Sequence, residues 1–223
     1  MTKSNTWSGP VQEEPQDGAI PDISIVIVSW NTRDLLVQCL QSIRDPAVAQ
    51  GLRLEVIVVD NASHDGSAGA ARAVPDAQVI ALPHNIGYGR ANNIGLRRAR
   101  GRYILVLNPD TVLLPGCLSA LVNFGGGEPH AGIVAPRLLN EDGSTQASAF
   151  RFPTIAMAAI DLFPLPRWVP GRLRAQLARS SWNGRYAIEQ QANQPFLVDH
   201  ALGACMLIRR EAYMQCGGFD PRI

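Results

Sequence analysis

Two aspartates that each follow an apolar run are the side chains best suited to chemistry in this 223-residue chain. Asp60 follows four apolar residues, and Asp110 follows the apolar run Tyr103–Leu107 after an Asn-Pro pair. A carboxylate at the end of a buried strand can hold Mg²⁺ or Mn²⁺, which offsets the charge of a diphosphate leaving group. Asp110 suits this role, and Asn108 reaches the same edge without adding charge. The alternative is that Asp110 only caps the turn that it forms with Thr111.

Asp60 has two interpretations that the residues alone leave open. Its carboxylate needs a hydrogen-bond donor, and the N–H of a pyrimidine base would serve as one. Equally, the carboxylate could accept from the backbone of the loop at Asn61–Ser63. Either partner would satisfy a carboxylate at the end of a buried strand.

A second cluster of polar residues and glycines lies at 85–95. Asn85, Gly87 and Asn92 bring flexible backbone and amide donors to the start of an expected helix, which favours contacts with a phosphate or a ribose. The spacing does not match the dinucleotide-binding fingerprint, because Asn92 stands where a third glycine is needed. We therefore do not expect a dehydrogenase.

Alternating strand and helix patterns would bring these residues together. Because strands and helices alternate up to residue 136, we expect an α/β fold with a mostly parallel sheet and helices on both faces. Ligands on such sheets bind outside the carboxyl ends of the strands, where both aspartates lie. The expected strands span 23–29, 54–60, 77–81, 103–107, 133–135, 196–198 and 204–208. The expected helices begin at 31 or 32, after 69, at 91, at 115 and at 211, and Gly125–Gly127 ends the fourth of them.

The chain divides into a polar lead-in and one folded domain. Residues 1–21 are rich in Pro, Gly and Glu without a period, which predicts a disordered segment. Residues 22–223 form the domain, with halves 22–136 and 137–223, because the pattern changes after residue 136. A turn signal at 140–144 and four prolines within 151–170 favour a variable lid or a wall of the acceptor site there rather than a sheet.

Charge, apolar content and cysteines limit the classes of function. The net charge of +1 gives no field that favours nucleic acid. No apolar run reaches the length of about 18 residues that spans a membrane. No secretory signal opens the chain and the four cysteines form no CxxC pair, so we expect a cytoplasmic protein. Residues 151–186 carry six arginines against one aspartate, which favours peripheral contact with an anionic lipid surface or a phosphorylated acceptor, or else a solvated basic face.

Six motifs in a fixed order resemble the family 2 inverting glycosyltransferases and are most similar to the rhamnosyltransferase-like bacterial branch. The resemblance covers residues 23–220. The motifs are Ser-Ile-Val-Ile-Val-Ser-Trp-Asn (24–31), Val-Val-Asp-Asn-Ala-Ser (58–63), Asn85-x-Gly87 with Asn92 and Gly95, Asn108-Pro109-Asp110, Gly203-Ala204-Cys205-Met206 with Arg209-Arg210, and Gly217-Gly218-Phe219-Asp220.

The resemblance implies a GT-A nucleotide-diphospho-sugar transferase fold, with 22–136 as the nucleotide-sugar-binding half and 137–223 as part of the acceptor-side half. It implies a catalytic site that contains Asp110 and Asp220, in which Asp110 binds Mg²⁺ or Mn²⁺. It implies that a sugar, with rhamnose preferred, passes with inversion from a nucleoside diphosphate to a cell-surface glycan or a lipid-linked acceptor at the inner face of the plasma membrane. The substrate contacts that it implies are Asn31, Asp60, Asn85, Gly87, Asn92, Asn108 and Gly203.

Inversion needs a general base for the acceptor hydroxyl, and the resemblance implies that this base lies in an acidic segment after Asp220. The sequence ends three residues after Asp220, which predicts that this chain lacks the segment. The alternative to a complete transferase is therefore a truncated domain that binds the donor without completing transfer. His200 could act as a substitute base, although a structural role is the favoured interpretation. A sugar-nucleotide pyrophosphorylase is a further alternative, but Trp30–Arg33 lacks the Gly-rich loop that such a protein needs after its first strand.

Overall fold

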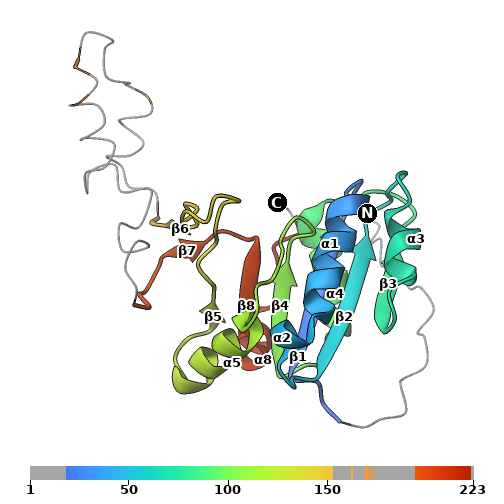
Figure 1. Cartoon of the computed structure of the whole chain (residues 1–223), viewed down its shortest axis with the longest axis horizontal. Helices are drawn as coiled ribbons and strands as arrows, with labels where there is room; N and C mark the ends of the chain where they lie inside the picture. The colour runs from blue at the N-terminus through green and yellow to red at the C-terminus, as the bar shows by residue number, and fades with distance from the viewer. Residues whose placement is uncertain (1–18, 153–161, 163–168, 171, 173–193, 222–223) are drawn as a thin grey trace, which may run out of the picture.

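The computed structural model describes residues 19–152, 162, 169–170, 172 and 194–221 of the chain. It contains a six-stranded main sheet and a separate pair of short strands (Figure 1). The main sheet consists of β1 (Ile23–Ser29), β2 (Leu54–Asp60), β3 (Ala77–Ala81), β4 (Tyr103–Leu107), β5 (Ile133–Val134) and β8 (Cys205–Arg209). The short pair is β6 (Ala149–Phe150) and β7 (His200–Ala201). The helices are α1 (Arg33–Arg44), α2 (Pro46–Ala49), α3 (Ser67–Arg72), α4 (Tyr88–Arg98), α5 (Cys117–Gly127) and α8 (Arg210–Cys216).

The sheet brings the carboxyl ends of its central strands to one edge. Its order is β3-β2-β1-β4-β8-β5, in which β3, β2, β1 and β4 are parallel and β8 is antiparallel to both β4 and β5. Asp60 at the end of β2 pairs with Ser29 of β1, and Leu107 at the end of β4 pairs with Ile27. The two segments that carry the predicted site aspartates therefore flank the end of β1, and the predicted mostly parallel sheet is confirmed.

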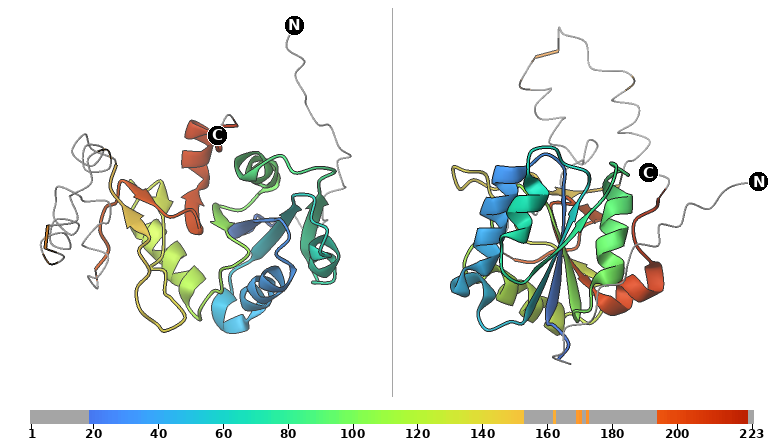
Figure 2. Two further views of the ribbon diagram at one scale, coloured as in Figure 1. Left: turned by 90° about the horizontal axis from the view of Figure 1, so that it is seen from above. Right: turned by 90° about the vertical axis from the view of Figure 1, so that its right-hand side faces the viewer.

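Helices cover both faces of the sheet, which Figure 2 shows edge-on in its right-hand view. The α1, α2, α3 and α5 helices pack on one face, and α4 and α8 pack on the other. All seven residues of β1 are buried, as expected for a β-branched run that is covered on both sides. The α4 helix approaches the sheet closely, because a Cβ at Gly95 would lie 2.3 Å from Val26 Cγ1. The two packed layers hold the strand ends at a fixed spacing.

Three helices clearly differ from their predicted bounds, and in α5 a tertiary contact overrides the local signal. The α3 helix begins at Ser67 and not after residue 69. The α4 helix begins at Tyr88, three residues earlier than expected. The α5 helix begins at Cys117, after Pro115, and it continues through Gly125–Gly127 instead of ending there. The first of these glycines packs against the Tyr103 ring, where a Cβ would lie 3.4 Å from the nearest ring atom. Packing on β4 therefore keeps a glycine-rich turn helical despite its low helix propensity.

The second half of the chain departs further from the prediction. Residues 196–198 form no strand, and β7 at His200–Ala201 pairs instead with β6. The strand expected at 133–135 exists at Ile133–Val134, but it lies antiparallel to β8. Residues 1–18 of the predicted lead-in lie outside the described residues. So does most of the arginine-rich stretch 151–186, of which only 151–152, 162, 169–170 and 172 are described. Within the described ranges, no helix is both long and apolar enough to cross a membrane.

The neighbouring arginines of the Arg209-Arg210 motif each close the end of a helix. Arg209 binds the carbonyl of Gly125 in the last turn of α5. Arg210 binds the carbonyls of Ala99 and Gly101, which follow α4, each at 2.6 Å. The last carbonyl groups of a helix lack partners within it, so a cation there satisfies them and interacts favourably with the helix dipole. One dipeptide thus fastens helices on opposite faces of the sheet to β8.

A buried carboxylate ties together the strand beginnings at the opposite edge of the sheet. Glu55 is 5% exposed, and its Oε2 accepts hydrogen bonds from the Ser24 hydroxyl and from Arg100 N–H. Its Oε1 accepts from the Arg100 guanidinium at 2.9 Å. Burial by itself would raise the pKa of Glu55, but the hydrogen bonds from Ser24 and Arg100 outweigh it and hold the pKa below its usual value.

The Glu55 network predicts a pH-dependent stability. Because the folded state lowers the Glu55 pKa, its contribution is fully present above the unfolded pKa of about 4.3 and is lost as pH falls through the lower folded value. We expect Glu55→Gln to cost about 2 kcal/mol of unfolding free energy at pH 7 and much less near pH 3. Urea unfolding of both proteins at the two pH values measures this. An equal cost at both pH values would show that Glu55 acts by shape and not by charge.

Candidate active site

Asp60 has one satisfied and one unsatisfied carboxylate oxygen at the carboxyl end of β2. The residue is 3% exposed. Its Oδ2 accepts from Ser63 N–H at 3.1 Å, whereas Oδ1 is buried and has no hydrogen-bond partner. The predicted contact with the following loop is therefore present, and it engages only one of the two carboxylate oxygens. A buried acceptor without a donor is costly in folded proteins, and Asp60 Oδ1 shares this state with Asn92 Oδ1 and the Tyr103 hydroxyl among the described residues.

Asn31 at the end of β1 holds the loop that follows Asp60. Its φ of 54° is in the left-handed region, which asparagine tolerates better than most residues. Its N–H donates to Ser63 Oγ at 2.9 Å, and its Oδ1 accepts from His64 N–H at 2.8 Å. Both partners, Ser63 and His64, belong to the loop that follows Asp60. Asn31 is thus next to Asp60, as predicted, and it serves to fix the loop around it.

The N-terminus of α1 is capped from this loop and not by its own preceding residues. Thr32 is at the N-cap position but makes no side-chain cap hydrogen bond. Instead, Arg33 N–H donates to Asp65 Oδ2 at 2.8 Å. The helix expected to begin at 31 or 32 therefore has Thr32 at its N-cap position, but the carboxylate that accepts from its first turn belongs to Asp65. A hollow of about 330 Å³ opens here, lined by Asn31, Thr32, Arg33, Asp34, Leu35 and Asp65.

Asn85 and Asn61 fix the glycine loop before α4. Asn85 Oδ1 accepts from Asn61 Nδ2 and from Gly87 N–H, each at 2.9 Å. Asn61 Oδ1 in turn accepts from Ile86 N–H at 3.0 Å. Gly87 has a φ of 86°, which suits glycine. Sequence analysis missed Asn61 as a site residue, although its place directly after Asp60 at a strand end was the available signal.

Tyr88 connects the first turn of α4 to the Asn-Pro-Asp segment. Its hydroxyl donates to Asn108 Oδ1 at 3.0 Å and lies 3.4 Å from the Gly203 carbonyl. Asn108 N–H also donates to the Ala204 carbonyl at 2.8 Å. Burial, together with the nearby Asp110 charge, raises the pKa of the Tyr88 phenol, so the hydroxyl keeps its proton and donates at neutral pH. The structure brings the predicted residues Asn108 and Gly203 together through a tyrosine that sequence analysis did not single out.

Asp110 is the exposed carboxylate of the site. Its negative charge contributes to raising the pKa of the Tyr88 phenol. At Cys39, burial and, to a smaller extent, the Asp110 charge raise the pKa of the thiol to about 12. No group of three or more His, Cys, Asp or Glu side chains suited to a metal lies within the part of the chain that the structure describes. A cation bound at Asp110 would therefore need oxygens from a substrate. This donor set fits Mg²⁺ or Mn²⁺, which proteins commonly hold through one or two carboxylates and substrate phosphates.

Asn92 supports the site from within α4. It is 0% exposed, and its Nδ2 donates to the Tyr88 carbonyl at 3.0 Å. With no surface open to a ligand, its side chain acts in this structure on the helix turn that carries Tyr88. The predicted substrate contact at Asn92 therefore has no exposed surface to use here.

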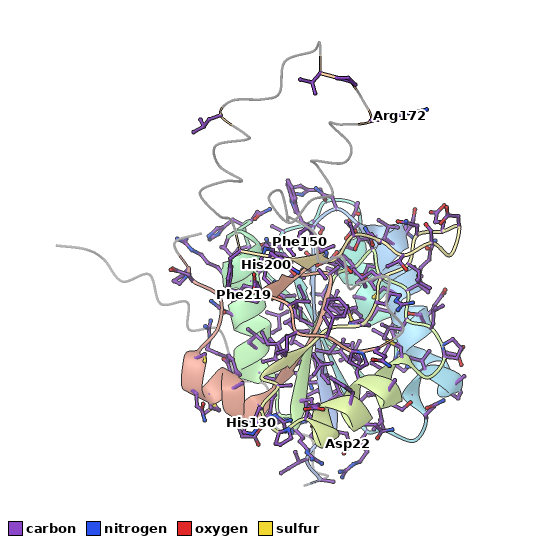
Figure 3. The ribbon with its side chains drawn as sticks, turned by 90° about the vertical axis from the view of Figure 1, so that its left-hand side faces the viewer. Asp22, His130, Phe150, Arg172, His200 and Phe219 are labelled. Atoms are coloured by element: carbon purple, nitrogen blue, oxygen red, sulfur yellow. The ribbon has the colours of Figure 1, made fainter. Side chains whose placement is uncertain are left out.

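Asp220 and His200 are the two side chains considered for the acceptor side in the sequence. Asp220 is half-buried in the segment that follows α8. His200 stacks on Phe150 with ring centroids 5.0 Å apart and planes 15° apart. In Figure 3, these two rings and Phe219 lie toward the same end of the molecule, away from His130. A ring that is stacked in a short strand pair suits the structural role that was favoured for His200.

Comparison with known proteins agrees with this geometry. Residues 24–217 match the family model described as Glycosyl transferase family 2. The N-acetylglucosaminyl-diphospho-decaprenol L-rhamnosyltransferase of Mycobacterium tuberculosis is 27% identical over 212 residues, which are 90% of this chain and 65% of that protein. The chain therefore spans a little less than two thirds of the length of this relative. The UDP-Glc:alpha-D-GlcNAc-diphosphoundecaprenol beta-1,3-glucosyltransferase WfaP of Escherichia coli is 28% identical over 46% of this chain and 40% of that protein.

A solved structure supports the fold class. The mannosyltransferase PcManGT from Pyrobaculum calidifontis, in complex with GDP-Man and Mn²⁺, superposes with a TM-score of 0.57 at 20% identity, covering 96% of this chain and 52% of that one. The predicted GT-A α/β fold and the resemblance to the rhamnosyltransferase-like branch are confirmed. Since the family model extends from β1 to the end of α8, the chain belongs to the family 2 glycosyltransferases.

Proposed function

We propose that this protein transfers a sugar from a nucleoside diphosphate to an acceptor hydroxyl, with the donor bound at the carboxyl edge of β1, β2 and β4. The observation that carries the proposal is the buried, unpartnered Oδ1 of Asp60. A pyrimidine base offers an N–H that would satisfy this oxygen. The hollow at the start of α1 is lined by Asn31, which also binds the loop that follows Asp60. Residues 22–136 are thus proposed as the donor half, and 137–223 as part of the acceptor side.

Asp110 is the residue proposed to hold Mg²⁺ or Mn²⁺ against the donor diphosphate. When bound, the cation would offset charge on the departing diphosphate. The remaining substrate contacts are proposed at Asn31, Asn85, Gly87, Asn108 and Gly203. Asn92 is proposed to support them from within α4, through its hydrogen bond to the Tyr88 carbonyl. Asn85 and Gly87 shape the loop at the start of α4, where backbone N–H groups favour an anion.

The transfer itself is proposed to proceed with inversion. The acceptor oxygen would form its bond to the anomeric carbon as the bond to the diphosphate breaks, and the diphosphate would leave with the electron pair. A general base must accept the hydroxyl proton, and this base is proposed to lie in an acidic segment that follows Asp220. Asp220 itself is the catalytic carboxylate proposed on the acceptor side. The names of the two sequence relatives describe polyprenol-diphosphate-linked acceptors. They support a lipid-linked acceptor here, with rhamnose as the preferred sugar.

A thermal-shift panel tests the donor site directly. Thymidine, uridine and guanosine diphosphates are each added with Mn²⁺, with Mg²⁺ and with a chelator. Ligand at about 100 times its dissociation constant adds roughly 2.7 kcal/mol, or on the order of 5–10 °C for a domain of this size. A metal-dependent shift with one nucleotide supports the proposal and identifies the base. No shift with any of the three, from a protein that melts cooperatively, would refute it.

A further inference from the structure

The segment Gly217–Pro221 after α8 is tied to α4 by a side chain that sequence analysis did not single out. Asn93 Nδ2 donates to the Phe219 carbonyl at 2.7 Å, and Asn93 Oδ1 accepts from Phe219 N–H at 2.8 Å. The two hydrogen bonds resemble one rung of an antiparallel pair. Because a single side chain meets both backbone groups of Phe219, it fixes both the position and the orientation of that residue.

Glycine is required where this segment approaches α4. A Cβ at residue 218 would lie 2.1 Å from Asn93 Oδ1. Gly217 has a φ of 80°, in the region that favours glycine. The contact with Asn93 therefore accounts for Gly218, and the positive φ accounts for Gly217, without a ligand. A third contact, from Arg90 Nε to the Pro221 carbonyl at 2.8 Å, extends the attachment past Asp220.

Tyr88 links the same segment to the donor side of the site. Its ring meets the Phe219 ring edge-on, with centroids 6.0 Å apart and planes at 73°. Its hydroxyl binds Asn108, two residues before Asp110. One turn of α4 thus contacts the Asn-Pro-Asp segment through Tyr88 and the Gly-Gly-Phe-Asp segment through Asn93. The spacing between these two segments is set by a rigid helix.

We propose that Asn93 is a positioning residue for sugar transfer, which acts by fixing Phe219 and hence the place of Asp220 relative to Asn108 and Asp110. The inference rests on the proposed transferase function. Asn93 itself lies away from the helix face that packs on the sheet, which carries Ala91, Gly95 and Leu96. Removing its side chain should therefore leave the attachment of α4 to the sheet intact and release only the segment that follows α8.

The test is Asn93→Ala in the full-length protein, with Arg97→Ala as the control because Arg97 is exposed on the same helix, one turn later. A misplacement of about 1 Å can cost roughly 100-fold in rate, so we expect kcat to fall about tenfold, with the donor dissociation constant within about twofold of the wild type. Hydrogen exchange at residues 217–221, measured without substrate, should become faster in Asn93→Ala and remain unchanged in Arg97→Ala.

Asn93→Asp separates the two hydrogen bonds. It keeps an acceptor for Phe219 N–H but loses the donor and sets a carboxylate against the Phe219 carbonyl, so exchange and kcat should follow Asn93→Ala. Unchanged kcat or unchanged exchange in Asn93→Ala would overturn the inference. Loss of donor affinity together with kcat would overturn it as well, because it would mean that α4 itself had moved. A wild-type protein that binds no donor would instead refute the proposed function, whereas the exchange data would still show whether Asn93 holds the segment.

Discussion

Asp60→Asn is expected to weaken donor binding by roughly 100-fold while leaving the free protein as stable as the wild type or more stable. The Ser63 N–H can be accepted by the new amide oxygen, as it now is by Oδ2. The amide nitrogen would then occupy the place of the unpartnered Oδ1. An amide N–H cannot accept a hydrogen bond from the N–H of the nucleotide base. A lost hydrogen bond to a charged group costs up to about 3 kcal/mol, which is roughly two decades in affinity.

The unfolding free energy of Asp60→Asn should equal or exceed that of the wild type, because the ligand-free wild type carries a buried carboxylate oxygen without a partner. A neutral amide is less costly to desolvate than a carboxylate. The melting temperature of Asp60→Asn without ligand should therefore equal or exceed that of the wild type, while its nucleotide-induced shift disappears. Asp76→Asn is the matched control, since Asp76 is an exposed aspartate before β3, at the opposite edge of the sheet. A variant that loses stability and still binds the nucleotide would show that Oδ1 serves the fold.

The central strands were predictable because their sequence signal is local. The runs at 23–29, 54–60, 77–81 and 103–107 have the predicted bounds. The runs of β1 and β4 are buried throughout, as expected for strands within a covered sheet, whereas β3 is a partly exposed edge strand. The carboxyl-edge position of Asp60 and Asp110 follows from the same pattern, since parallel strands share one edge. For this reason the outline of the proposed donor side is predictable from the sequence alone.

The parts that could not be predicted depend on partners distant in sequence. Asn93 and Phe219 are 126 positions apart, and Tyr88 and Gly203 are 115 apart. No periodicity encodes such pairs. The local sequence predicts Asn93 to be an ordinary polar residue of a helix and Tyr88 to be part of a loop. The same reason applies to Gly125 of α5, which packs against the distant Tyr103 ring. Local propensity decides an element where no packing contact opposes it.

Asp110→Ala is expected to remove the metal dependence of donor binding and to lower transfer by at least about 1000-fold, the larger of the two main effects. Asp110 is the exposed carboxylate of the Asn-Pro-Asp segment, and no cluster of other metal-binding side chains exists among the described residues to replace it. A cation that stabilises developing charge is worth several kcal/mol, and about 1.4 kcal/mol corresponds to a tenfold change in rate. Without Asp110, the diphosphate would have to hold the cation alone.

The decisive measurement is the donor dissociation constant of Asp110→Ala with Mn²⁺ and with chelator. The two values should be equal in the variant and differ in the wild type. Asp110→Asn refines the result, because it keeps an oxygen ligand but removes the charge, and it should behave like the alanine variant if charge is what holds the cation. Glu141→Gln, a change to an exposed acid in a distant turn, should leave the metal dependence intact. Donor affinity that still rises with Mn²⁺ in Asp110→Ala would mean that the cation is held elsewhere, and Asp110 would then remain only as the cap of its own turn.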